Sequence, residues 1–139
     1  MTMHLNTSRQ TSDFRLARAN FVNVILEFAE ADFKVGISGQ PVRRVWNLGQ
    51  VPDSLLADYF RKPRVVGKMN RSYRSLDPRR LFILFETPSQ LAVRTAERDL
   101  ISLGRRYAKD RCVNINPGGE GRLPATGHYY VYLALGMSK

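Results

Sequence analysis

The sequence predicts an α+β domain with a small, mainly antiparallel sheet of three to four strands flanked by helices. Short runs of β-branched and aromatic residues alternate with segments that carry helix-start signals, and no internal repeat is present. The chain has 139 residues, of which 43% are hydrophobic, which is enough for one domain with a buried core. We expect residues 1–19 to form a flexible N-terminal segment and residues 20–139 to form a single domain.

The first half of the domain predicts a hairpin followed by helices. Residues 14–19 (FRLARA) either start a short helix or lead straight into a strand. Residues 21–28 (FVNVILEF) and 33–38 (FKVGIS) are typical of two antiparallel strands joined by the polar break at 29–32. Pro41 favours the first turn of a helix over 41–48, and residues 52–60 (PDSLLADYF) predict another short helix.

The second half predicts two strands around a long helix. Residues 80–87 (RLFILFET) predict an apolar strand, and Thr87 is the expected N-cap of a helix that runs to about Gly104 or a little beyond. A loop rich in glycine and proline follows over 112–127, and residues 128–135 (HYYVYLAL) close the chain as a strand.

Composition favours a polyanionic partner and excludes several classes of protein. The formal net charge is +10, with 22 basic against 12 acidic residues. No apolar run approaches transmembrane length and the N-terminus lacks the apolar stretch of a signal peptide, so we expect no membrane partner and a cytoplasmic location, in a host cell if the protein is viral. Cys112 is the only cysteine, and we expect a small buried apolar residue there.

The positive charge is concentrated in residues 61–80. This segment has eight basic residues and one acid, so 8 − 1 gives +7 of the total. A basic surface loop is one interpretation, and contacts with nucleic-acid phosphates are the interpretation that we favour. The predicted phosphate-binding residues here are Arg61, Lys62, Arg64, Lys68, Arg71, Arg74, Arg79 and Arg80.

Glu97 lies inside the apolar stripe of the helix predicted after Thr87. A step of about 100° per residue puts Val93, Leu100 and Ile101 within about 60° of it. A carboxylate that faces a core needs a partner, because burying a lone charge is costly. Two hypotheses follow: a glutamate at the core edge held by Arg43 or Arg44, or a metal ligand or general acid/base at a cleft. Arg94, Arg98 and Arg105 form a basic ridge beside it, and we expect that ridge and Arg43 to contact nucleic acid.

These features together resemble the GIY-YIG nucleases, which include homing endonucleases, some restriction enzymes and the first-incision domain of bacterial excision repair. The resemblance covers about residues 20–121 and is closest to divergent branches associated with phages and mobile elements. Lys34-Val35-Gly36 is similar to the family's second motif, and Arg44 falls where its catalytic arginine would stand. Residues 97–101 (ERDLI) match the helix that carries the catalytic glutamate. Asn114, or alternatively Asn116, matches the asparagine before a glycine-rich turn.

The chain departs from the family at the positions of its tyrosines. No tyrosine stands in residues 21–28, where the family's first strand would fall, and Lys34 replaces the tyrosine of the second motif. Residues 128–135 are similar to the family's first strand displaced to the C-terminus. Tyr130, or alternatively Tyr129 or Tyr132, would then reach the site from that strand, although strand-packing aromatic residues are the other interpretation.

The resemblance implies an endonuclease that uses one divalent ion, Mg²⁺ or Mn²⁺, on DNA phosphodiesters. Glu97 would be the metal ligand and Arg44 would neutralise charge on the phosphate. Lys34 or Tyr130 would assist the water and Asn114 would brace the loop near Glu97. DNA, or alternatively RNA, is the expected partner, and another protein could supply specificity. Two alternatives stay open: a degenerate GIY-YIG-like module that binds nucleic acid or inhibits another protein without cutting, and a small basic RNA-binding protein.

Overall fold

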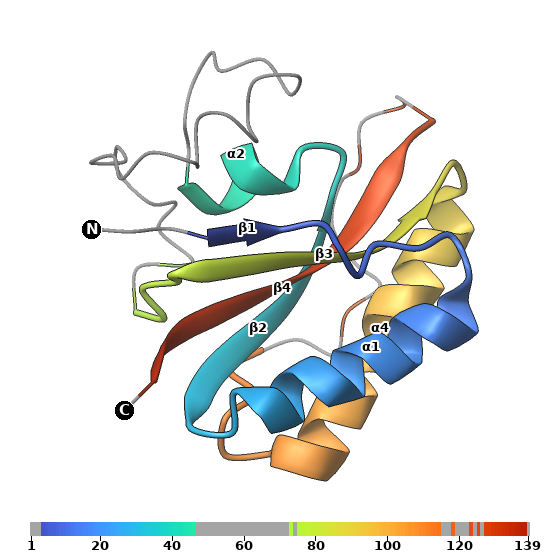
Figure 1. Ribbon diagram of the computed structural model, residues 1–139. Helices are drawn as coiled ribbons and strands as arrows, with labels where there is room; N and C mark the ends of the chain where they lie inside the picture. The colour runs from blue at the N-terminus through green and yellow to red at the C-terminus, as the bar shows by residue number, and fades with distance from the viewer. Residues whose placement is uncertain are drawn as a thin grey trace.

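The computed structural model describes residues 4–46, 73, 75–114, 118, 123, 125 and 127–138. Helices and strands alternate along most of this part of the chain (Figure 1). In chain order they are β1 (His4–Asn6), α1 (Phe14–Glu27), β2 (Ala31–Ser38), α2 (Pro41–Trp46), β3 (Arg80–Thr87), α4 (Gln90–Ala108) and β4 (Tyr129–Ser138).

The strands form one four-stranded sheet in the order β1-β3-β4-β2. The C-terminal strand β4 lies inside the sheet and is antiparallel to both β2 and β3, whereas the short β1 runs parallel to β3. The predicted fold class, an α+β domain with a mainly antiparallel sheet flanked by helices, is therefore confirmed.

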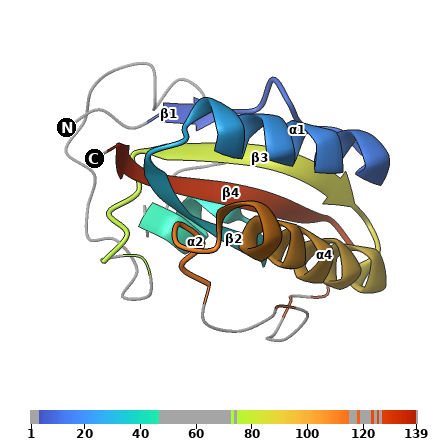
Figure 2. The ribbon, with the colours of Figure 1, turned by 90° about the horizontal axis from the view of Figure 1, so that it is seen from below.

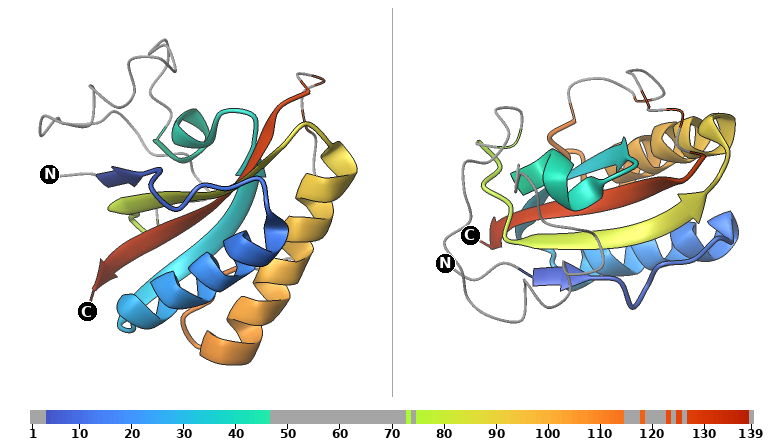
Figure 3. Two further views of the ribbon diagram at one scale, coloured as in Figure 1. Left: turned by 45° about the vertical axis from the view of Figure 1, so that its right-hand side comes forward. Right: turned by 90° about the horizontal axis from the view of Figure 1, so that it is seen from above.

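Each face of the sheet has its own hydrophobic cluster. Phe33 and Val35 of β2 belong to the larger cluster, which packs beneath α1 and α4. The smaller cluster lies on the other face and joins Val42 and Val45 of α2 to Tyr132 and Ala134 of β4. Views from below and from above show α1 and α4 on one side of the sheet and α2 on the other (Figures 2 and 3). Alternation along β2 therefore turns Lys34 and Gly36 toward the α2 face.

The predicted strand at 21–28 is wrong, because this segment belongs to α1. Its N-cap is Asp13, whose side chain accepts a hydrogen bond from the backbone N–H of Arg15. The buried residues of α1 are Ala17, Phe21, Val24 and Ile25. These residues follow one another at intervals of four, three and one positions, which places them on one face of a helix. This periodicity outweighs the strand preference of the β-branched residues.

The expected loose segment 1–19 also differs from the structure over residues 4–19. Residues His4–Asn6 pair with β3 in register with Arg80, Leu81 and Phe82. The backbone of Thr11 then exchanges hydrogen bonds with Leu84 and Glu86 of the same strand. This N-terminal part of the chain is held against the sheet edge by backbone hydrogen bonds that composition does not reveal.

The predicted hairpin is wrong as well, because the partner of β2 is β4. Their register pairs Lys34 with Ala134, Gly36 with Tyr132 and Ser38 with Tyr130. The outer edge of β2 is covered by residues 111–114: the N–H of Phe33 donates to the carbonyl of Arg111 at 2.8 Å, and the N–H of Val113 donates to the carbonyl of Phe33 at 2.9 Å.

The remaining predicted elements agree with the structure where it describes them. Strands at 80–87 and 128–135 and a helix from Pro41 are present as β3, β4 and α2. The long helix starts two residues later than predicted, with Ser89 as N-cap, and extends beyond Gly104 to Ala108. The predicted helix at 52–60 lies outside the described residues.

Candidate functional site

The pairing of β2 with β4 places a tyrosine directly over the glycine of the second motif. Tyr132 lies opposite Gly36, and a Cβ atom on Gly36 would stand 2.4 Å from the Tyr132 hydroxyl oxygen. Real Cβ contacts do not reach this distance, so only glycine allows the phenol to lie here. The glycine of the KVG motif therefore has a packing role that depends on a strand about 95 residues further along the chain.

A second phenol, which lies within the basic segment 61–80, meets Tyr132. The Tyr73 and Tyr132 hydroxyl groups share a hydrogen bond, and their ring centroids lie 6.4 Å apart. Both side chains are almost completely buried, with 2% of Tyr73 and 1% of Tyr132 exposed. Tyr73 is a residue of the site that the sequence alone did not predict.

Lys34 extends over Tyr73 on the same face of the sheet. Its Nζ atom lies 4.5 Å from the centroid of the Tyr73 ring, which is a cation–π contact. Partial burial lowers the pKa of Lys34, the charge of Arg44 lowers it further, and the charge of Glu97 acts in the opposite direction. Lys34 is therefore more easily deprotonated than an ordinary lysine.

Arg44 is brought to this place by α2. The helix packs on the sheet through Val42 and Val45, and Arg44 is on its exposed side. Its charge lowers the pKa of Lys34, Tyr73 and Tyr132 alike. The charge of Arg44 therefore acts on all three of these side chains. The side chain of its neighbour Arg43 lies outside what the structure describes.

Glu97 is buried in α4, as its place in the apolar stripe predicted. Only 8% of the residue is exposed, and Val93, Ala96, Leu100 and Ile101 are buried on the same helix. Gly118, with a φ of +92°, lies against it: a Cβ there would stand 3.2 Å from the Glu97 Cγ atom. The charge of Glu97 raises the pKa of Lys34 and of both phenols, so its carboxylate belongs to the same electrostatic group.

Lys34 and Tyr132 thus both contact Tyr73 on the α2 face of the sheet, and the charges of Arg44 and Glu97 act on these three side chains. We call these five residues the Lys34 cluster. Burial, as the largest cause, raises the pKa of Tyr73 and raises that of Tyr132 well above its usual value. Both phenols therefore keep their protons at neutral pH, and either hydroxyl can donate the hydrogen bond that they share. The members of the cluster are Lys34, Arg44, Tyr73, Glu97 and Tyr132.

Asn114 braces β2 instead of contributing to this cluster directly. Its Oδ1 atom accepts from the N–H of Val35 at 2.9 Å, and its Nδ2 atom donates to the carbonyl of Val35 at 2.8 Å. Its own carbonyl accepts from the guanidinium of Arg105 at 3.1 Å, which ties this segment to α4. The side-chain amide is thus engaged by the backbone next to Lys34, which suits the bracing role better than a chemical one. Asn116 lies outside the described residues.

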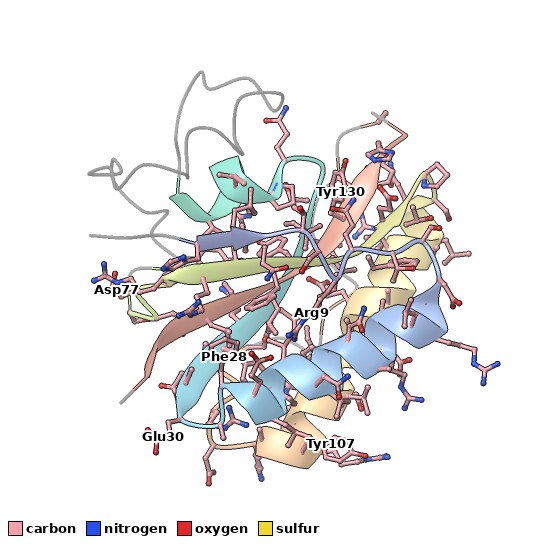
Figure 4. The ribbon with its side chains drawn as sticks, viewed as in Figure 1. Arg9, Phe28, Glu30, Asp77, Tyr107 and Tyr130 are labelled. Carbon is pink, nitrogen blue, oxygen red and sulfur yellow. The ribbon has the colours of Figure 1, made fainter. Side chains whose placement is uncertain are left out.

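Of the three C-terminal tyrosines, Tyr132 is the one in the cluster. Tyr129 faces the larger core, where its hydroxyl accepts from Gln90 Nε2 at 3.0 Å. Tyr130 is half-buried and packs edge-to-face against His128, with ring centroids 4.8 Å apart. Figure 4 shows Tyr130 near the loop between β2 and α2, far from Tyr107 at the end of α4. Tyr130 shares a face with Tyr132, one pleat away, and sequence alone could not choose between them.

The predicted phosphate-binding residues divide into three groups. Arg79 forms an ion pair with Asp77 at 2.9 Å, and Arg80 stacks on Phe28 at 4.9 Å on the face opposite the cluster. Arg94 and Arg98 lie on α4 beside Glu97, and Arg105 holds Asn114. The residues that lie outside the described part of the chain are Arg61, Lys62, Arg64, Lys68, Arg71 and Arg74.

No family model, curated protein or solved structure matches this chain. No helix in the described residues is both long and apolar enough to cross a membrane. An open hollow of about 270 Å³ lies between α1 and α4, lined by Arg15, Arg18, Ala19, Val22, Leu103 and Tyr107, and it contains no member of the Lys34 cluster. Function is therefore inferred from the geometry of the cluster.

The Lys34 cluster offers a divalent ion one carboxylate ligand, that of Glu97. Within the described ranges no group of three or more histidine, cysteine or acidic side chains could hold a metal ion. Glu97 can supply one carboxylate oxygen, and Mg²⁺ accepts such a site when water and substrate phosphate complete its coordination. The chemistry of this site therefore fits an ion that arrives with the substrate better than a permanently bound one.

Proposed function

We propose that this protein is a divergent GIY-YIG-like endonuclease that hydrolyses DNA phosphodiesters with one Mg²⁺ or Mn²⁺ ion. The observation that carries the proposal is the Lys34 cluster itself. A lysine of lowered pKa and a protonated phenol both contact a second protonated phenol, and the charges of an arginine and a buried carboxylate act on all three, although the five residues come from β2, β4, residue 73, α2 and α4. Perturbed groups of both signs at one place are more typical of catalysis than of packing.

Lys34 is the group best suited to take the proton of an attacking water. Its lowered pKa gives it a larger neutral fraction at working pH than an ordinary lysine has. Tyr132 and Tyr73 have raised pKa values, so a protonated phenol would orient the water or a phosphate oxygen by donating a hydrogen bond. Tyr132 would stand in for the missing first-strand tyrosine of the family, because β4 is the strand that pairs with β2.

Arg44 and Glu97 would act on the phosphate. The guanidinium of Arg44 would neutralise charge that develops on the phosphoryl oxygens. The carboxylate of Glu97 would hold the divalent ion, which when bound polarises the phosphate and stabilises the leaving oxygen. The attraction of Glu97 for Lys34 is weaker when an ion shares the carboxylate, which favours the neutral lysine.

The partner that fits this site is DNA, with RNA as the other polyanion of the same backbone charge. The net charge of +10 and the arginines beside Glu97 on α4 support it. We infer a cytoplasmic location, in a host cell if the protein is viral, and a protein partner that supplies specificity.

The test is cleavage of supercoiled plasmid by the purified chain with Mg²⁺ or Mn²⁺. We expect the parent to nick the plasmid and both Arg44→Ala and Glu97→Gln to lose this activity. Tyr107→Phe is the matched control, because Tyr107 is 58% exposed and outside the cluster, and it should cut like the parent. Absence of cutting with either metal, together with retained DNA binding, would refute the endonuclease and favour a module that binds without cutting.

A further inference from the structure

Tyr73 contacts two members of the cluster with two different parts of its side chain. Its hydroxyl group hydrogen-bonds the Tyr132 hydroxyl, and the face of its ring lies 4.5 Å from the Lys34 ammonium. The residue is 2% exposed and packs with Val42, Val45 and Leu76 in the smaller core cluster. A single buried side chain thus connects the donor and the base of the proposed reaction.

The position of Tyr132 depends on this contact. One side of its phenol lies on Gly36, where no side chain fits, and the ring is fixed by the core around it. Within this apolar setting a hydroxyl group needs a partner, because an unsatisfied buried hydroxyl is costly. When the Tyr73 hydroxyl donates to the Tyr132 oxygen, it supplies this partner and leaves the Tyr132 O–H to donate to the substrate.

The position of Lys34 depends on the ring. The lysine side chain has a flexible stem, and Glu97 attracts its ammonium while Arg44 repels it. The face of the Tyr73 ring attracts the ammonium and gives this flexible side chain a defined place on the sheet.

We propose that Tyr73 is a positioning residue of the site, which aims the Tyr132 hydroxyl with its own hydroxyl and holds the Lys34 ammonium on its ring. This role rests on the proposed endonuclease function. It deepens that function because it assigns to one residue of the basic segment a part in setting the proton-transfer groups, and not only a part in binding the nucleic-acid backbone.

The first test is a double-mutant cycle on single-turnover plasmid cleavage. We expect Tyr132→Phe to slow cleavage by about 10²-fold and Tyr73→Phe by about 10-fold. The double variant should be no slower than Tyr132→Phe alone, because the Tyr73 hydroxyl acts through Tyr132. Losses that multiply, or a Tyr73→Phe variant that cuts like the parent, would overturn the role of the hydroxyl. Tyr107→Phe is again the control, and melting curves by circular dichroism show whether each variant is folded.

The second test does not require cutting. Labelling of Lys34 by an amine-reactive reagent, read by mass spectrometry across pH, gives its titration midpoint. Tyr73→Phe keeps an aromatic face and should leave the midpoint unchanged, whereas Tyr73→Ala admits water and should move it upward toward that of an ordinary lysine. An unchanged midpoint in Tyr73→Ala would overturn the contact with Lys34. A parent that does not cut would refute the endonuclease, and the labelling result would still decide the contact.

Discussion

Lys34 is a basic residue at a position of β2 where an apolar side chain would be expected. It stands on a strand between Phe33 and Val35, which are buried on the other face, and it shares its own face with the buried Tyr132 and Ala134. An apolar side chain would pack here without the cost of placing a cation beside Arg44. A residue that lowers stability at one place is expected where function depends on it.

Replacing Lys34 should raise stability while it removes activity. The folded protein lowers the pKa of Lys34 below the ordinary 10.5, so the unfolded chain binds the proton more tightly. Lys34 therefore lowers the free energy of unfolding by its full amount at pH values below its pKa in the folded state. This loss of stability disappears as the pH rises through that pKa toward 10.5. We expect Lys34→Met to melt at a higher temperature than the parent at pH 7 and the difference to shrink toward pH 10. A difference that grows with pH would contradict the lowered pKa.

Glu97→Gln separates a chemical role of the carboxylate from a structural one. If Glu97 holds the ion, the amide should abolish Mg²⁺-dependent cutting and leave DNA binding equal or tighter, because a negative charge near phosphate is removed. Binding by fluorescence anisotropy, nicking and melting temperature are measured on the same preparation. Cutting that survives in a variant of lower melting temperature would show that Glu97 only stabilises the fold.

At the scale of elements, the sequence predicts the strands that keep a simple pattern and fails at α1. β3 and β4 are apolar runs with aromatic and β-branched residues, and they are strands as predicted. Residues 21–28 have a similar composition, yet Phe21, Val24 and Ile25 continue a helical spacing from Ala17. The helical spacing and the N-cap at Asp13 are the signals that indicate a helix here, whereas the composition, on which the prediction of a strand was based, does not.

The partner of β2 could not be predicted from local sequence. Hairpins join neighbouring segments most often, and this rule favours residues 21–28 as the partner. The actual partner, β4, is identified by Gly36 and Tyr132, because only a glycine permits this phenol across the pair. Pairing between distant strands depends on such complementary shapes, which become visible only in three dimensions.

The brace on the outer edge of β2 should contribute to stability and to the site. Asn114→Ala removes two hydrogen bonds to Val35, so we expect a loss of about 2 kcal/mol in the free energy of unfolding. Asn23→Ala, at an exposed position of α1, is the matched control and should change stability little. Urea denaturation measures both. Equal small losses in the two variants would contradict the bracing role.

At the scale of the whole molecule, the positive charge is not uniformly available to a ligand. Arg79 is engaged by Asp77 and Arg80 by Phe28, whereas Arg98 is exposed on α4 next to Glu97. The last two arginines of residues 61–80 therefore contribute less to the binding of a polyanion than the charge density of the segment suggests. The basic ridge lies on α4 beside Glu97, and the proposed nucleic-acid backbone would pass over it.

Salt dependence of DNA binding should distinguish these arginines. Each lost phosphate contact lowers the slope of log affinity against log salt by about one. We expect Arg98→Gln to flatten the slope by about one unit and Arg79→Gln to change it less, because Arg79 already pairs with Asp77. Titrations of labelled duplex DNA between low and high salt measure the slope. The reverse order would place the binding surface on the other side of the molecule.

The individual members of the site were easier to predict than their assembly. The burial of Glu97 and the placement of Arg44 follow from helical spacing and from the helix start at Pro41. Tyr73 was not predicted as a member of the site, because its contact with Tyr132 joins two residues 59 positions apart. The choice of Tyr132 over Tyr130 depends on which residue of β4 lies opposite Gly36, and only the register of the sheet determines this.

The central claim is that the C-terminal strand completes the site through Tyr132. The most direct measurement compares single-turnover plasmid cleavage by Tyr132→Phe and Tyr130→Phe, two substitutions of the same kind one pleat apart on β4. The structure predicts a loss of about 10²-fold for Tyr132→Phe and near-parent cleavage for Tyr130→Phe, because the Tyr132 hydroxyl lies against Gly36 and shares a hydrogen bond with Tyr73. A larger loss in Tyr130→Phe, or equal rates in both variants, would contradict the claim.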